Sequence, residues 1–131
     1  MSKFTLVDDN LTARDLAVEH GFALVVDCAA GRFLFDTGAG AALLPNLAAL
    51  GIPAGSLRRV IFSHGHFDHT GGLAALAAVE PELQIYAAPG LTCRRYSRHP
   101  GQKPYELTMP VASRQALGNP ARLQEIATFQ E

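Results

Sequence analysis

The stretch FSHGHFDHTGG, residues 62–72, constrains this chain more than any other part of its sequence. It places three of the five histidines and one aspartate within the six residues from His64 to His69. The strand-like segment 59–62 leads directly into it, and an alanine- and leucine-rich segment begins at Gly72. The cluster is therefore expected where a buried strand ends and a helix begins, which is where open α/β sheets place their functional sites.

The spacing within this cluster fits metal ligation. His64 and His66 are two residues apart, so on extended backbone their side chains point the same way and can meet one ion. Asp68 and His69 are adjacent and need a turned backbone to converge on a second point. A catalytic zinc takes neutral imidazoles and carboxylates and keeps one position for water. A solvated polar loop is the alternative, but three histidines and an aspartate in an H-x-H-x-D-H frame favour metal binding.

The rest of the chain predicts a mixed α/β sheet covered by helices. Strand patterns cover residues 3–7, 22–28, 32–36, 59–62 and 83–87, and helical patterns cover residues 41–50 and 72–79. The second and third strands are expected to form a hairpin with Gly31 in its turn. Alternation of strands and helices then follows, as in α/β folds. Residues 89–97 and 113–117 are candidate short helices, and residues 122–129 fit either a strand or a helix.

Composition favours a single soluble domain. A chain of 131 residues is long enough to bury a core. Its net charge of −1 gives no electrostatic footprint for nucleic acid or for an anionic membrane surface. Cys28 and Cys93 are too few and too distant in sequence for a disulfide framework, and no apolar run approaches the about 18 residues that cross a bilayer. We expect a cytoplasmic protein with no membrane or nucleic-acid partner.

Two motifs resemble one enzyme family. SHGHFDHTGG resembles the H-x-H-x-D-H signature of the metallo-β-lactamase superfamily of metal-dependent hydrolases, and FLFDTG, residues 33–38, resembles its earlier Asp-Thr-Gly motif. Their order and spacing agree with that family. EHGFALVVD, LGI and RRYS extend the similarity to dihydropterin–ribofuranosylaminobenzene phosphate synthases, linked to methanopterin-type biosynthesis. The resemblance implies the N-terminal half of an αββα sandwich that is built from two similar halves.

The resemblance also implies roles for individual residues. His64 and His66 would ligate a first metal, and Asp68 and His69 a second. Up to two zinc ions are implied, although iron or manganese also suits these ligands. Asp68 is the catalytic candidate, because it would orient the bridging water or take a proton. Asp36 would lie behind the ligands and position them, and a role as a cap at the strand end is a compatible alternative.

The implied reaction is attack of a zinc-bound hydroxide on an ester, phosphoester or lactone-like bond of a small molecule. The sequence assigns no substrate-binding residue. A basic stretch beside two tyrosines could receive a phosphate or carboxylate group, although a solvated face is the favoured interpretation. It consists of Arg94, Arg95, Arg98 and Lys103.

The ligand set of the family is incomplete in this sequence. The second half of the family fold supplies two further histidines and an aspartate that bridges the metals, whereas no aspartate follows Asp68 here. The remaining candidates are His20, His99, Cys93, Glu106 and Glu125. An isolated histidine is more often a surface residue than a ligand.

We therefore expect residues 1–131 to be one truncated half-domain. Besides an active hydrolase, two alternatives stay open: a non-catalytic metal-binding remnant, and a subunit whose partner or symmetry mate supplies the missing ligands. A half-fold also leaves a sheet edge and an apolar helix face uncovered, which predicts a homodimer.

Overall fold

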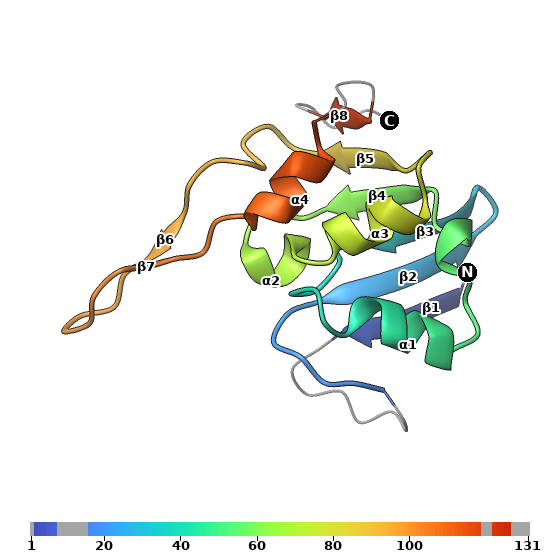
Figure 1. Cartoon of the computed structure of the whole chain (residues 1–131), viewed down its shortest axis with the longest axis horizontal. Helices are drawn as coiled ribbons and strands as arrows, with labels where there is room; N and C mark the ends of the chain where they lie inside the picture. The colour runs from blue at the N-terminus through green and yellow to red at the C-terminus, as the bar shows by residue number, and fades with distance from the viewer. Residues whose placement is uncertain (1, 8–15, 119–121, 127–131) are drawn as a thin grey trace.

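The structure is a computed structural model and describes residues 2–7, 16–118 and 122–126. Its centre is a six-stranded sheet in the order β1-β2-β3-β4-β5-β8 (Figure 1). The first three strands are antiparallel, and β3, β4, β5 and β8 run parallel to one another. The strands are β1 Ser2–Val7, β2 Ala23–Cys28, β3 Gly31–Phe35, β4 Arg59–Phe62, β5 Gln84–Ala87 and β8 Leu123–Glu125. The predicted mixed α/β sheet is confirmed.

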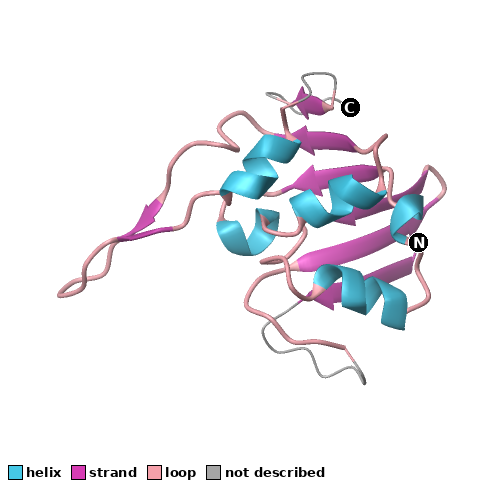
Figure 2. Cartoon of the chain, viewed as in Figure 1, coloured by secondary structure: helices cyan, strands magenta, loops and turns pink. Residues whose placement is uncertain are grey.

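The helices lie on one face of this sheet (Figure 2). They are α1 Leu43–Ala49, the 3-10 turn η1 Ala54–Ser56, α2 Phe67–Thr70, α3 Leu73–Val79 and α4 Val111–Ala116. Pro45 lies in the first turn of α1, where a missing N–H costs no intrahelical hydrogen bond. Among the described residues, no helix combines the length and the apolar character that crossing a bilayer requires.

Strand alternation places the core between the sheet and the helices. Leu34, Val60 and Ile85 are fully buried on the side that faces the helices. They pack in one cluster with leucines of α1 and α3, which have helical spacing: Leu43, Leu47, Leu73 and Leu76. The core therefore fixes β4, and with it the segment that follows β4, against two helices.

The hairpin prediction is confirmed. β2 and β3 pair with Cys28 opposite Gly31, and Gly31 has a φ of 112°, which favours glycine over any other residue. β8 resolves the ambiguity of residues 122–129, because residues 123–125 pair in parallel with β5. The end of that predicted segment, residues 127–129, lies outside the described residues.

Of the two short helices predicted in the C-terminal part, the first does not form and the second forms with a different start. Residues 89–97 form turns and a short strand, because the Arg95 guanidinium donates to the carbonyls of Gly90 and Cys93 at 2.8 and 3.1 Å. These bonds hold the segment in a turn. The candidate helix at residues 113–117 is confirmed as α4, which begins after Pro110, two residues before the predicted start. The buried Ser113 hydroxyl donates to the Thr70 carbonyl at 2.7 Å, which ties α4 to the end of α2.

A two-stranded ribbon extends from the domain beyond α2 and α4 (Figure 1). It consists of β6, Tyr96–Ser97, and β7, Tyr105–Glu106. Its base is fixed near the histidine cluster, since the backbone N–H of Phe67 donates to the Leu107 carbonyl at 2.9 Å.

Candidate metal site

The histidine cluster lies at the C-terminal end of β4, where the sequence predicts it. His66 is the N-cap of α2 and has extended backbone, so His64 and His66 precede the helix while Asp68 and His69 lie within it. The three imidazole rings gather at one place. The ring centroid of His64 is 4.4 Å from that of His66 and 4.1 Å from that of His69.

Asp36 fastens the end of β3 to this cluster. Its carboxylate accepts the backbone N–H of Ser63 at 2.8 Å and the Ser63 hydroxyl at 2.6 Å. It also lies 2.8 Å from Nδ1 of His69, and its side chain is only 1% exposed. Asp36 adopts a φ of 59°, a backbone conformation that asparagine and aspartate tolerate better than most other residues. Asp36 therefore both caps the strand end and orients His69.

The adjoining Asp-Thr-Gly loop holds α2 in place from the same side. The Thr37 backbone N–H and hydroxyl both donate to the His69 carbonyl, at 2.7 and 2.9 Å. The N–H of Gly72 donates back to the Thr37 hydroxyl at 3.0 Å, and that of Gly71 donates to the Gly38 carbonyl at 2.9 Å. Hydrogen bonds thus connect the Asp-Thr-Gly motif directly to the segment that carries the histidine motif.

Asp68 has one oxygen that the described residues leave unpaired. Its Oδ2 lies 3.1 Å from Nε2 of His20 and 3.8 Å from Nε2 of His69. Its Oδ1 is buried and has no hydrogen-bond partner in the part of the chain that the structure describes. A buried carboxylate oxygen without a partner is unusual in folded proteins and is expected to bind a proton donor or a cation.

His20 is a residue of this site that sequence reasoning left among surface candidates. It lies before β2, where Gly21 has a φ of 134° and the Phe22 N–H donates to the Asp68 carbonyl at 3.3 Å. This backbone contact brings the loop before β2 onto α2. No local pattern could reveal it, because His20 and Asp68 are far apart in the sequence and meet only through the sheet order.

The residue types at the site fit a metal ion, although their arrangement is not that of a closed coordination sphere. In the part of the chain that the structure describes, no group of three or more His, Cys, Asp or Glu side chains is arranged to hold a metal ion. Imidazoles and carboxylates are nevertheless the donors of catalytic zinc sites, and the Asp68 carboxylate lies beside the three imidazoles, with its Oδ2 3.8 Å from Nε2 of His69.

The family follows from comparison with known proteins. Residues 17–106 match the family model of the metallo-beta-lactamase superfamily. The chain belongs to this superfamily. Its members typically bind metal ions such as zinc, and the fold is of the metal-dependent hydrolase type.

Individual relatives are similar over part of their length. A 7,8-dihydropterin-6-methyl-4-(beta-D-ribofuranosyl)-aminobenzene-5'-phosphate synthase of Methanocaldococcus jannaschii is 35% identical over 79 residues, covering 56% of this chain and 27% of that protein. The similarity to this synthase subgroup, predicted from the motifs, is confirmed. The chain spans about a quarter of this relative.

Solved structures of the superfamily share the fold. A metal-dependent hydrolase of the beta-lactamase superfamily, Tm1679, matches with a TM-score of 0.67 and 24% identity, over 98% of this chain and 42% of that one. MEM-A1, a subclass B3 metallo-beta-lactamase from a soil metagenome library, matches with a TM-score of 0.59 and 20% identity, over 96% and 43% of the two chains. This superfamily chain therefore spans less than half of either solved protein.

The remaining ligand candidates lie away from the histidine cluster. His99 lies in the ribbon, where its Nε2 is 3.0 Å from the Ser97 hydroxyl and its ring stacks on Tyr105. Glu106 accepts a hydrogen bond from Arg94 at 3.3 Å. Cys93 is exposed in the turn before the ribbon, and Glu125 is exposed on β8.

The basic stretch divides into structural and exposed residues. Arg95 is bound to backbone carbonyls of the preceding turn, so its role is structural. Arg94 lines a groove of about 610 Å³ with Phe67 and Arg114, next to α2. Arg98 and Lys103 are exposed in the ribbon segment.

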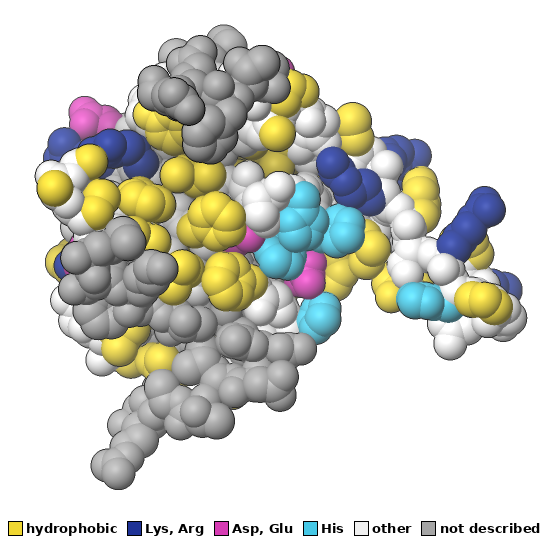
Figure 3. Space-filling model, turned by 180° about the vertical axis from the view of Figure 1, so that it is seen from behind, with side chains coloured by type: hydrophobic (Ala, Val, Ile, Leu, Met, Phe, Trp, Pro, Cys, Tyr) yellow, Lys and Arg dark blue, Asp and Glu magenta, His cyan; other side chains and the backbone are white. Residues whose placement is uncertain are grey.

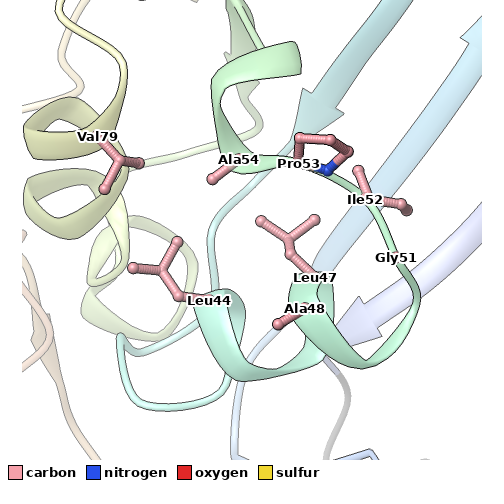
Figure 4. A pocket seen from close by; sticks show the side chains of 8 residues that line it. All are labelled: Leu44, Leu47, Ala48, Gly51, Ile52, Pro53, Ala54 and Val79. Atoms are coloured by element: carbon pink, nitrogen blue, oxygen red, sulfur yellow. The ribbon is translucent and has the colours of Figure 1, made fainter.

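An apolar pocket of about 430 Å³ lies on the helix side of the sheet (Figure 4). Leu44 and Leu47 of α1, Val79 of α3 and the segment 51–54 line it. None of its lining residues is titratable, so it offers no group for metal or acid–base chemistry. The histidine cluster is therefore the better candidate for chemistry.

In the metal-free chain, His69 is expected to titrate above its ordinary pKa of 6.5 and His64 below it. The hydrogen bond to Asp36 raises the pKa of His69, against the opposing effect of burial. Burial lowers the pKa of His64, and the positive charges of His69 and His66 lower it further. A histidine with a lowered pKa stays neutral near pH 7, which is the form that binds metal.

The two shifts act on stability with opposite sign. Protonated His69 stabilises the fold below pH 6.5, and this contribution is lost as the pH rises through its raised folded pKa. His64 resists protonation in the fold. Its contribution to stability is therefore lost as the pH falls from 6.5 through its lowered folded pKa.

NMR titration of the imidazole C–H signals measures the pKa values of His64 and His69. Asp36→Asn should lower the pKa of His69, and an unchanged His69 would contradict the assignment.

Proposed function

We propose that this chain is the metal-binding half of a metal-dependent hydrolase that acts on an ester, phosphoester or lactone-like bond of a small molecule. His64 and His66 would hold one ion, and Asp68 and His69 a second. The observation that carries the proposal is the gathering of three imidazoles with the carboxylate of Asp68, one oxygen of which is buried and unpaired among the described residues. Zinc bound here would lower the pKa of a bound water to near 7 and polarise a substrate oxygen.

The residues behind the ligands support this proposal. A hydrogen bond from Nδ1 of His69 to Asp36 leaves Nε2 with a free lone pair, which is the tautomer that a metal requires. The Ser63 hydroxyl, which donates to Asp36, also lies 2.8 Å from Nδ1 of His64. One buried carboxylate therefore orients two imidazoles, one directly and one through a serine.

Asp68 is the proposed catalytic residue. It is the one carboxylate beside the three imidazoles with a buried oxygen unpaired among the described residues, so it can orient a water or accept a proton from it. His20 at 3.1 Å from its other oxygen would hold the carboxylate in place. We propose His20 as a positioning residue.

Zinc binding tests the proposal. The wild-type chain should hold at least one zinc ion, and His66→Ala should weaken binding by about tenfold or more, because it removes an imidazole from the set. His99→Ala is the matched control, since that histidine lies in the ribbon and makes its contacts there. Native mass spectrometry and cobalt(II) absorption spectra would report occupancy and ligand geometry. Equal zinc binding by wild-type chain and His66→Ala would contradict the proposal.

A synthase reaction is the second candidate. The 35% identical relative is named a synthase whose product carries an aminobenzene and a 5'-phosphate, so a phosphorylated or pterin-like small molecule is the favoured substrate class. Assays of phosphoester hydrolysis beside assays with a dihydropterin would distinguish the two. Turnover of the dihydropterin alone would favour the synthase.

A further inference from the structure

Three consecutive residues before β2, Glu19, His20 and Gly21, each contact the candidate metal site or the loop beside it. The rear view shows a group of histidine side chains at the surface, with acidic side chains beside them (Figure 3). We call residues 17–22 the strap, because hydrogen bonds fasten this segment to α1, to the loop around the Asp-Thr-Gly motif and to α2. The strap therefore connects three parts of the chain that meet at the site.

Both ends of the strap are fixed. The Ala17 N–H donates to Oδ1 of Asn46 at 2.7 Å, and Nδ2 of Asn46 donates to the Ala17 carbonyl at 2.9 Å. Asn46 lies on α1 and is 1% exposed, so it cannot move without disturbing the core. At the other end, the Phe22 N–H donates to the Asp68 carbonyl at 3.3 Å, and the Phe22 carbonyl accepts the Gly38 N–H at 2.9 Å.

The Glu19 carboxylate holds the middle of the strap. Its Oε2 accepts the backbone N–H of Ala39 at 3.1 Å, and its Oε1 accepts that of Ala41 at 2.8 Å. Hydrogen bonds from backbone N–H groups to an ionised carboxylate are stronger than those between neutral groups. Because both oxygens are engaged, the carboxylate determines how the strap lies on the loop that follows the Asp-Thr-Gly motif.

Gly21 lets the backbone of the strap lie directly on α2. It has a φ of 134°, in the range that favours glycine. A Cβ at this position would lie 2.2 Å from the carbonyl oxygen of Asp68 and 3.3 Å from the backbone nitrogen of Ala39. These atoms belong to the backbone and cannot rotate away. The strap therefore touches the helix that carries Asp68 and the loop that binds Glu19 at the same point.

The position of His20 depends on this backbone arrangement. Its Nε2 lies 3.1 Å from Oδ2 of Asp68, although its side chain is 71% exposed. Its ring is tilted against that of Phe67, with 6.4 Å between the ring centroids. Packing restrains an exposed side chain little, so the residues on either side must hold the backbone that places the ring at Asp68. Glu19 and Gly21 are those two residues.

We propose that Glu19 is a positioning residue of the metal site and that it acts through His20. By fixing the strap, Glu19 holds the His20 ring against Asp68. The Asp68 carboxylate is thereby kept beside His69, whose Nε2 lies 3.8 Å from its Oδ2. This role rests on the proposed function, because it concerns the affinity of these ligands for a metal ion. The alternative is that Glu19 stabilises the loop without affecting Asp68.

The substitutions Glu19→Gln and His20→Ala, alone and together, test this role. Glutamine keeps the size of the side chain but loses its charge and one acceptor. Zinc affinity, measured by calorimetric titration, should fall about tenfold in each single variant. Since both changes act on one contact, the double variant should also lose about tenfold rather than about hundredfold. Glu82→Gln is the matched control, because Glu82 is exposed in the turn after α3, and it should bind zinc like wild type.

Cobalt(II) absorption spectra separate positioning from stability. If the carboxylate is displaced, the visible bands of the bound ion change, and they should change alike in Glu19→Gln and His20→Ala. A loss of loop stability alone would lower the urea midpoint and leave the bands of the folded chain as in wild type. Circular dichroism shows which variants fold. If Glu19→Gln does not fold, Glu19→Asp, which keeps the charge but has a shorter reach, takes its place in the comparison.

The outcomes distinguish this role from the proposed function. Affinity losses that multiply in the double variant, or wild-type cobalt bands in folded Glu19→Gln, would overturn the positioning role. His66→Ala in the same titration reports on the proposed function. If His66→Ala weakens zinc binding and Glu19→Gln does not, the proposed function stands and the role of Glu19 fails. If His66→Ala leaves zinc binding unchanged, the proposed function fails and the role of Glu19 fails with it.

Discussion

Replacing Asp36 with alanine is expected to lower the free energy of unfolding by about 2–4 kcal/mol. Asp36 accepts hydrogen bonds from the Ser63 N–H and hydroxyl and binds Nδ1 of His69. Alanine leaves these groups without their partner at a position where the carboxylate is 1% exposed. It also places an ordinary residue at a φ of 59°. Urea denaturation followed by circular dichroism measures the change.

Asparagine and glycine at the same position separate the two causes. Asp36→Asn keeps one carbonyl acceptor and tolerates the left-handed backbone, so it should lose less stability than Asp36→Ala. Asp36→Gly removes the acceptors but relieves the backbone, so it should lie between the other two. Alanine and wild-type chains of equal stability would contradict the role of these bonds.

The same substitution should affect the metal. Without Asp36, His69 can take either tautomer and rotate, and zinc affinity is expected to fall by about 10- to 100-fold. Calorimetric zinc titration measures this loss. A folded Asp36→Ala chain with wild-type affinity would show that Asp36 stabilises the fold without orienting the ligand.

The sequence could predict the site where its causes are local. His64 and His66 follow a strand, and Asp68 and His69 begin a helix, so their spacing determines how they gather. The hairpin turn at Gly31 is local in the same way. Predicting these features requires only the side-chain periodicity of strands and helices and one glycine in a turn.

The parts that could not be predicted arise from contacts between distant segments. His20 reaches Asp68 only because the loop before β2 lies on α2. The composition of residues 89–97 favours a helix, but the segment forms a turn. The Arg95 guanidinium donates to backbone carbonyls that would accept the hydrogen bonds of a helix. The strand choice of residues 123–125 depends on the open edge of β5. Each outcome is decided by a tertiary contact that outweighs local propensity.

Replacing Gly71 with alanine is expected to lower the free energy of unfolding by about 1–3 kcal/mol, because the added methyl group has no room in the packed interior. A Cβ at Gly71 would lie 2.0 Å from the carbonyl oxygen of Ala39 and 2.4 Å from its carbonyl carbon. Both atoms are backbone, so no side chain can rotate away. Gly71 has a φ of −66°, which alanine adopts readily, so the expected loss is steric and owes nothing to backbone strain.

Gly55→Ala is the matched control, because a Cβ there would meet only Glu80 Oε2 at 3.7 Å, an ordinary contact. The free energy of unfolding of that variant, measured in urea, should lie within about 0.5 kcal/mol of the wild-type value. Gly71→Ala must push α2 away from the Asp-Thr-Gly loop and lengthen the 2.9 Å bond from its N–H to Gly38. Asp68 and His69 move with α2, so zinc affinity should fall together with stability. Unfolding of Gly71→Ala at the same urea concentration as Gly55→Ala would contradict this close packing.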